Sequence, residues 1–288
     1  MSVSRILFEE IISLLLEMIN RTIKTTHCNI EIAESDGKGK TILFIHGNSS
    51  CKEVFRHQIN GDVGKLFHCI AMDLPGHGNS GNALIPEQTY TMSGYADVVL
   101  QVMRSLGVTS YVIVGWSLGG HIAVETLSLT DEIAGLMISG TPPVGKNPDD
   151  LASAFLPSEH MAFTGQENLS ADEADRYARA TCGTAANYEP FLGEAVLRTD
   201  GRARRLMMEA VGQGKGADQR NVVKTSLIPI AVVNGADEEM VNNDYLKTVA
   251  FGNLWRRRIH LLPNVGHAPF WESPKEFDRL ILEYMKDV

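Results

Sequence analysis

The sequence predicts an α/β fold: a mostly parallel, doubly wound sheet that carries an inserted helical cap. Short apolar runs rich in β-branched residues alternate with helical stretches, and this repetition is typical of a parallel sheet. The runs are almost continuously apolar, as strands covered by helices on both faces require. The alternation stops between residues 141 and 226, which predicts the cap.

The candidate strands are seven runs, at 28–34, 41–47, 67–73, 110–115, 135–140, 229–235 and 258–262. Helical stretches lie at about 92–106, 118–130, 242–251 and 274–286. Within 141–226 the segments ADEADRYARAT and FLGEAVLRTDGRARRLMMEAV have a helical pattern. We therefore expect a core of residues 24–140 and 227–288. The cap, residues 141–226, should lie above the carboxyl ends of the strands, where such sheets bind ligands.

The N-terminal residues have a different pattern. Residues 5–23 carry apolar side chains near a helical period, but glutamates make the run too polar for a membrane span, and it lacks the features of a signal peptide. We expect residues 1–23 to form an amphipathic helix outside the main fold. Its apolar face must be covered by the domain, a membrane surface or a second subunit, so it is a candidate homodimer contact. Met18 is an alternative start of the protein.

Composition excludes several classes of function. The chain has 288 residues, 44% of them hydrophobic, and a formal net charge of −9, which argues against binding nucleic acid or anionic membranes. The basic clusters at 202–205 and 256–258 are interpreted as solvated faces. No C-x-x-C pair or Cys/His cluster occurs, so we expect a cytoplasmic protein with neither a disulfide framework nor a zinc site. The four scattered cysteines are Cys28, Cys51, Cys69 and Cys182.

One serine lies between two glycines where a strand meets a helix. Residues 112–121 read VIVGWSLGGH, so Gly115-Trp116-Ser117-Leu118-Gly119 fits G-x-S-x-G. This motif forms a strained turn that exposes the hydroxyl and needs small residues two positions before and after it. The N-terminus of the following helix favours developing negative charge. We therefore expect Ser117 to be a catalytic nucleophile.

A serine nucleophile needs a base and an acid, which follow it along the chain in this kind of fold. His267 lies after the last strand, in PNVGHAPF, where it can reach over the end of the sheet. The preceding strand, PIAVVNG, is followed by Asp237, Glu238 and Glu239. The acid commonly lies three residues after the glycine of that strand. This position favours Glu238 and leaves Asp237 as the alternative.

Two backbone amides are expected to bind an oxyanion. Leu118 directly follows the nucleophile, and Asn48 lies on the loop HGNSS after the strand at 41–47. The remaining histidines near these motifs are interpreted as structural rather than catalytic: His46, His77 and His121.

Four motifs together resemble the α/β-hydrolases: HGN at 46–48, DLPGHGNS at 73–80, GWSLGGH at 115–121 and GHAPF at 266–270. Less generic stretches are GLMISGTPPV, YARATCG, RTDGRARR, PIAVVNGADE and FGNLW. They are similar to the metal-independent N-acyl-homoserine lactonases of this fold (AidH type). Several lie in the expected cap, so they bear on the substrate. The resemblance covers about residues 24–288 and leaves residues 1–17 without a counterpart.

The resemblance implies a triad of Ser117, Glu238 and His267, with the amides of Asn48 and Leu118 as oxyanion donors. It implies opening of the lactone ring of N-acyl-homoserine lactones, a quorum-quenching activity. No cofactor is expected, and the sequence lacks the H-x-H-x-D-H cluster that holds two zinc ions in metal-dependent lactonases.

The acyl chain is expected to lie in an apolar groove under the cap. Candidate substrate contacts are Trp116, Met161, Tyr177 and Phe270, and the Tyr177 hydroxyl is a candidate partner of the substrate amide. Met207 and Met208 fit either the groove or ordinary core packing. Two alternatives stay open: a general carboxylesterase, and a receptor that binds the lactone without turnover.

Overall fold

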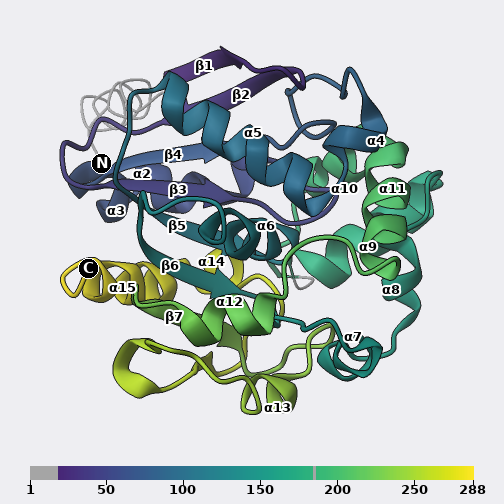
Figure 1. Ribbon diagram of the computed structural model, residues 1–288. Coiled ribbons are helices and arrows are strands. Elements are labelled where there is room, and N and C mark those ends of the chain that lie inside the picture. The colour runs from purple at the N-terminus through teal and green to yellow at the C-terminus, as the bar shows by residue number, and fades with distance from the viewer. Residues whose placement is uncertain (1–18, 184–185) are drawn as a thin grey trace, which may run out of the picture.

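The computed structural model describes residues 19–183 and 186–288, and its centre is a mostly parallel sheet. The eight strands lie in the order β1-β2-β4-β3-β5-β6-β7-β8 (Figure 1). β2 pairs antiparallel with β1 and β4, and the pairings from β4 to β8 are parallel. The expected fold class is confirmed. The strands are β1 (Ile19–Lys24), β2 (Asn29–Glu34), β3 (Thr41–Ile45), β4 (His68–Met72), β5 (Tyr111–Trp116), β6 (Ile133–Ser139), β7 (Ile230–Gly235) and β8 (His260–Leu262).

Helices cover both faces of this sheet. On one face lie α5 (Met92–Ser105), α6 (Leu118–Leu127) and α12 (Gln219–Thr225). On the other lie α2 (Arg56–Asn60), α3 (Asp62–Leu66), α14 (Pro269–Glu272) and α15 (Pro274–Tyr284). Successive residues of β5 point to opposite cores, as strand geometry requires. Ile113 therefore packs with α6, whereas Val112 and Val114 pack on the α14 side.

The first described strand corrects one expectation. Residues 19–23 belong to β1 rather than to the end of an amphipathic helix. β1 pairs along its whole length with β2, Ile23 is buried in the core, and Arg21 forms an ion pair with Glu34. Pairing with the next strand therefore overrides the helical period that runs into this segment. Residues 1–18 lie outside the described residues, so the extension and the homodimer contact expected there stay predictions.

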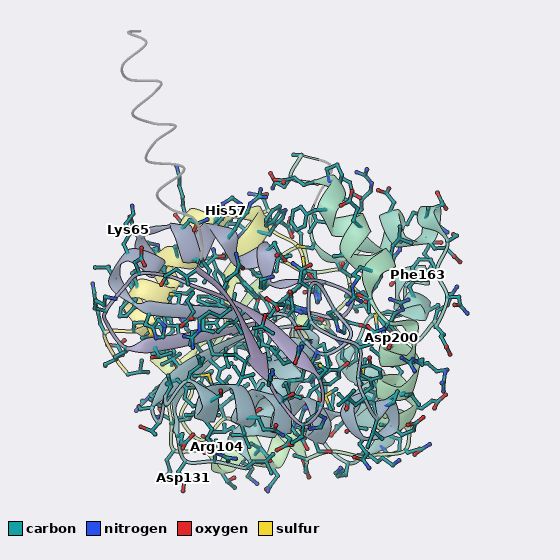
Figure 2. All side chains as sticks on the ribbon, turned by 90° about the horizontal axis from the view of Figure 1, so that it is seen from above. His57, Lys65, Arg104, Asp131, Phe163 and Asp200 are labelled. Carbon is teal, nitrogen blue, oxygen red and sulfur yellow. The ribbon has the colours of Figure 1, made fainter. Side chains whose placement is uncertain are left out.

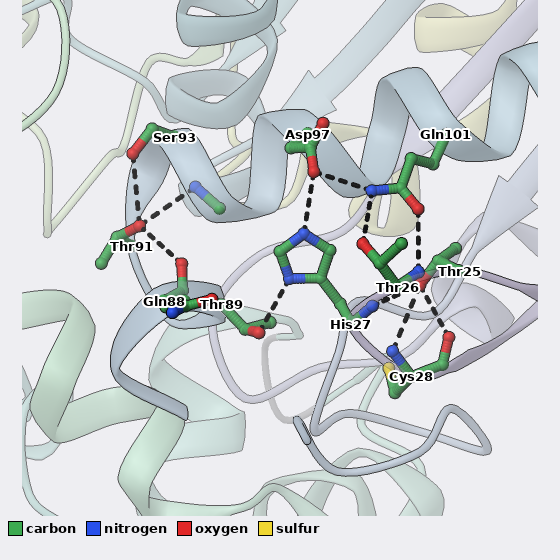
Figure 3. A network of polar contacts seen from close by, with 11 residues as sticks. Thr25, Thr26, His27, Cys28, Gln88, Thr89, Thr91, Ser93, Asp97 and Gln101 are labelled. Carbon is green, nitrogen blue, oxygen red and sulfur yellow. Dashed lines mark hydrogen bonds and ion pairs between the residues drawn. The ribbon is translucent and has the colours of Figure 1, made fainter. Parts of the chain in front are cut away.

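A polar network fixes the turn between β1 and β2 on α5 (Figure 3). The His27 ring lies between the Thr89 hydroxyl, 2.8 Å from Nδ1, and the Asp97 carboxylate, 2.9 Å from Nε2. Gln101 bonds both the backbone and the hydroxyl of Thr26. These bonds hold the turn between β1 and β2 against Thr89 and α5.

The cap consists of helices gathered at one end of the sheet, on the right in Figure 1. Seen from above, Phe163 and Asp200 lie on this side, and Lys65 and Arg104 lie at the other end of the molecule (Figure 2). Tyr90 donates a 2.7 Å hydrogen bond to Asp200 and so ties the cap to the core. The cap helices are α7 (Pro148–Ala154), α8 (Glu159–Phe163), α9 (Ala171–Thr181), α10 (Pro190–Arg198) and α11 (Gly201–Gly212).

Two other expectations are refined. The segment at 191–211 is two helices, because Thr199 ends α10 and the Asp200 side chain caps α11. The stretch at 242–251 holds only the short α13 (Asn243–Leu246). The remaining short elements are η1 (Lys52–Phe55), α4 (Pro86–Thr89) and η2 (Trp255–Arg257). Among residues 19–183 and 186–288, no helix has the length and apolar character to cross a membrane.

Candidate active site

Ser117 lies on a strained turn between β5 and α6. Its backbone has φ 52° and ψ −118°, a conformation that side chains rarely adopt. The turn is crowded, since a Cβ on Gly115 would lie 2.6 Å from the Gly119 carbonyl oxygen and one on Gly119 would lie 2.1 Å from the carbonyl oxygen of Ile45. The two glycines therefore permit a close approach that other residues would prevent. The Ser117 amide donates to the carbonyl of Ser139, 2.8 Å away on β6, which fixes the turn to the sheet.

His267 and Glu238 form a buried pair beside this turn. The Nδ1 of His267 donates a 2.8 Å hydrogen bond to Oε2 of Glu238. The pair joins the loop after β8 to the loop after β7, as parallel strand ends at one edge of the sheet allow. The His267 ring packs on Gly140, where a Cβ would lie 2.6 Å from its Cε1. His267 and Ser117 both line the same cavity.

Glu238 is held as a carboxylate. Burial alone raises its pKa, but the charge and hydrogen bond of His267 outweigh burial, with help from backbone amides, so the pKa lies below its ordinary value. One of these amides, that of Met240, donates to Oε1 at 2.8 Å. Asp237 and Glu239 are exposed, and the structure brings only Glu238 to His267.

Asn48 lies on the loop after β3 and connects it to the cap. Its side-chain amide donates to the Thr164 carbonyl at 2.9 Å, and its side-chain oxygen accepts a 3.2 Å bond from Ser49. The buried Arg204 of α11 donates in turn to the Ser49 hydroxyl at 3.1 Å. Asn48 and Leu118 both line the cavity that holds Ser117. The cap therefore fixes the loop on which the first expected oxyanion donor lies.

A cavity of about 600 Å³ lies between the sheet ends and the cap. Apolar residues make up much of its wall, and five methionines contribute, whose flexible side chains adapt to ligand shape. Met161 and Tyr177 line it as expected, and so do Met207 and Met208. Burial raises the pKa of Tyr177, and the charge of Arg204 and the amide of Asn48 oppose this rise only in part, so the phenol stays protonated. The remaining apolar lining residues are Met92, Leu118, Val144, Pro148, Leu151, Phe155, Val211, Ala217 and Met240.

Two of the expected substrate contacts do not line this cavity. Trp116 and Phe270 are almost completely buried and lie outside the cavity wall. Trp116 follows the alternation of β5, which directs it away from α6 and toward α14, where it packs against the Phe270 ring at 5.1 Å. Its indole nitrogen donates to the carbonyl of His267 at 2.9 Å. Trp116 therefore supports the loop that carries His267 from behind.

The three histidines interpreted as structural, His46, His77 and His121, differ in their surroundings. Burial lowers the pKa of both His46 and His77. His46 accepts a bond from the Leu74 amide, and His77 bonds the Pro75 carbonyl, as structural histidines do. His121 is bonded through Nδ1 to Gln219 at 2.8 Å, but it also lines the cavity. The bond to Gln219 therefore accounts for Nδ1 of His121 but not for Nε2.

Several residues that position the site lie outside the catalytic motifs found in the sequence. Thr164, Gly140 and Arg204 position Asn48 or His267, yet each lies outside the quoted catalytic motifs. Gly140 has φ 58°, and a glycine at the end of a strand was a signal for such a turn. In the part of the chain that the structure describes, no group of three or more His, Cys, Asp or Glu side chains could hold a metal ion.

Residues 42–280 match the alpha/beta hydrolase family, and the chain belongs to that family. It is 23% identical over 277 residues to the AB hydrolase superfamily protein YisY of Bacillus subtilis, covering 91% of this chain and 97% of that protein. It is 22% identical to a pimeloyl-[acyl-carrier protein] methyl ester esterase of Nitrosomonas europaea, covering 85% of this chain and 95% of that protein. The fold and these relatives support a hydrolase.

Among solved structures, the chain is similar to N-acyl homoserine lactonase AidH complexed with N-butanoyl homoserine. The two share 45% identity and a TM-score of 0.91 over 94% of this chain and 97% of that one. A mutant of AidH complexed with N-hexanoyl homoserine lactone superposes equally well, with a TM-score of 0.91. The esterase RhEst1 from Rhodococcus sp. ECU1013 shares the fold at 20% identity and a TM-score of 0.75, over 94% of this chain and 99% of that one.

Proposed function

We propose that this chain hydrolyses the lactone ring of N-acyl-homoserine lactones to N-acyl-homoserines. One observation carries the proposal: the His267–Glu238 pair, Ser117 and Asn48 meet at one cavity with a largely apolar wall. The similarity to AidH, which includes the cap, supports the choice of substrate. Such a reaction destroys a quorum-sensing signal, and quorum quenching in the cytoplasm is the proposed role.

Ser117 is the proposed nucleophile and His267 its general base. His267 takes the hydroxyl proton as Ser117 attacks the lactone carbonyl, and Glu238 stabilises the imidazolium that forms. The amides of Asn48 and Leu118 bind the oxyanion, and each such donor contributes roughly 3 kcal/mol to the transition state. His267 then protonates the ring oxygen as the carbon–oxygen bond breaks.

The leaving alcohol remains tethered to the acyl-enzyme, so it can close the ring again. Water must therefore compete for the ester, with His267 again acting as base. The acyl chain lies against the methionine-rich wall, with Met161 as a contact. Tyr177, a protonated phenol in that wall, is the proposed partner of the substrate amide.

Mass spectrometry tests this proposal directly. The protein is incubated with N-butanoyl- and N-dodecanoyl-homoserine lactone in the presence of EDTA, with Ser117→Ala as the matched control. We expect a gain of one water that depends on Ser117 and is unaffected by EDTA. Cleavage of p-nitrophenyl acetate without ring opening would instead establish the carboxylesterase alternative. Tight lactone binding with neither reaction would establish a receptor.

A further inference from the structure

The cavity has a polar stripe along one helix. Ser117, the N-cap of α6, is followed at intervals of four residues by His121 and Glu125 on that helix, and all three line the cavity. Residues spaced in this way lie on one face of a helix, so the stripe leads away from the nucleophile along the floor of the cavity. The proposed reaction uses only its first member. Glu125 is occupied by a 2.7 Å bond from the Ala217 amide.

Gln219 of α12 fixes the orientation of the His121 proton. The Gln219 side-chain nitrogen lies 3.4 Å from the His121 carbonyl, which can only accept, so the side-chain oxygen must face the ring. That oxygen lies 2.8 Å from Nδ1 of His121. Because an amide oxygen only accepts hydrogen bonds, Nδ1 must carry the proton and donate it.

The other ring nitrogen of His121 is then an acceptor. Burial lowers the pKa of His121, and the bond to Gln219 only partly opposes this, so the ring is neutral near pH 7. Its Nε2 therefore presents a lone pair. Among residues 19–183 and 186–288, no side chain or backbone amide donates to this nitrogen. A ligand in the cavity meets an acceptor here rather than a donor.

The spacing of His121 and Ser117 along the chain is comparable to one span of the proposed substrate. Four residues of helix separate the backbones of His121 and Ser117 by about 6 Å. In an N-acyl-homoserine lactone, five bonds lead from the reacting carbonyl carbon to the third carbon of the acyl chain. An extended chain advances roughly 1.2 Å per bond, or about 6 Å over these five.

We propose that His121 is a specificity-determining residue that accepts a hydrogen bond from a hydroxyl group on the third carbon of the acyl chain. This inference rests on the proposed lactonase function. A 3-hydroxyl donates to Nε2, whereas a 3-oxo oxygen is a second acceptor facing the same lone pair. An unsubstituted methylene leaves Nε2 desolvated without a partner. The site therefore favours 3-hydroxyacyl substrates over 3-oxoacyl substrates.

The experiment compares kcat/KM for N-(3-hydroxyhexanoyl)-, N-hexanoyl- and N-(3-oxohexanoyl)-homoserine lactone. We expect the wild-type protein to prefer the 3-hydroxy over the 3-oxo substrate by about tenfold. His121→Phe removes the acceptor and lowers this ratio to about one. His121→Gln restores both a donor and an acceptor, and it lowers the ratio by a gain on the 3-oxo substrate. His57→Phe, at a histidine of α2 outside the cavity wall, keeps the wild-type ratio.

The outcomes separate the two proposals. Ring opening of all three substrates with a wild-type ratio near one would overturn the role of His121 alone. A preference that survives in both His121→Phe and His121→Gln would do the same, and His121→Gln decides if the phenylalanine variant does not fold. No opening of any lactone, with p-nitrophenyl acetate still cleaved, would overturn the lactonase function and this inference with it.

Discussion

Replacing Glu238 by glutamine tests how the site sets the tautomer of His267. Oε1 of Glu238 accepts from the Met240 amide at 2.8 Å, and Oε2 accepts from Nδ1 of His267 at 2.8 Å. In Glu238→Gln the remaining oxygen must stay at the Met240 amide, because that amide only donates. The new NH₂ group then faces His267 and donates to Nδ1. The proton of His267 moves to Nε2, which can no longer accept the proton of Ser117.

The expected size of the loss in kcat follows from this change of tautomer. The equivalent acid-to-amide change in a serine protease triad lowers kcat about 10⁴-fold, because it leaves the geometry intact but fixes the wrong tautomer. That factor corresponds to about 5 kcal/mol of transition-state stabilisation. We expect a loss of similar size in Glu238→Gln. Asp237→Asn is the matched control, and because Asp237 is exposed it should keep kcat within about twofold.

The assay measures kcat for N-hexanoyl-homoserine lactone and for p-nitrophenyl acetate, with circular dichroism to verify the fold of each variant. Both substrates should lose rate together in Glu238→Gln, since the tautomer affects every acyl transfer at Ser117. If Glu238→Gln retains more than about a tenth of the wild-type kcat, the tautomer argument is wrong. A larger loss in Asp237→Asn than in Glu238→Gln would make Asp237 the acid.

Three further predictions concern residues around the site and the core. Gly140→Ala places a Cβ 2.6 Å from Cε1 of His267, and since a displacement of about 1 Å can cost about 100-fold, we expect such a loss of kcat in steady-state assays. Arg204→Met leaves the carbonyls of residues 166, 167 and 196 and the Ser49 hydroxyl without their donor, so the free energy of unfolding in urea should fall by about 3 kcal/mol. Burial raises the pKa of Asp278 to about 6 from 3.8, so the folded state binds the extra proton and stability falls as pH rises through this window. Asp278→Asn should abolish this fall and raise stability at pH 7 by at most about 3 kcal/mol, measured by urea unfolding between pH 4 and 7.

The strands of the sheet and the proposed catalytic residues could be predicted because each follows a pattern in the local sequence. The seven expected strands correspond to β2 through β8, since their apolar runs are long and bounded by turn residues. Ser117 and the pair of His267 and Glu238 followed from spacing, because the turn and the strand ends constrain which residues can meet. β1 could not be found in the same way. It carries only two isoleucines, and its place in the sheet comes from pairing with β2.

The walls of the cavity were less predictable, because lining depends on which side of the chain a residue faces. Trp116, which adjoins Ser117 in the sequence, was expected to contact substrate. The alternation of Val112, Val114 and Trp116 along β5 placed all three in the core on the α14 side, and this pattern was available in the sequence. Phe270 packs against Trp116 in the same core. Proximity in sequence was therefore a weaker guide than the period of the strand.

At the candidate site, the loop after β3 connects the core to the cap. The core supplies the groups proposed to break the ester bond, and the cap supplies most of the apolar wall. Asn48 lies on the core loop and is hydrogen-bonded to Thr164 of the cap. A cap that shifts in response to substrate therefore acts on the amide of Asn48, since loop and cap share this hydrogen bond. Because binding energy accelerates a reaction only where it is realised in the transition state, this link gives the acyl chain a means to influence kcat as well as KM.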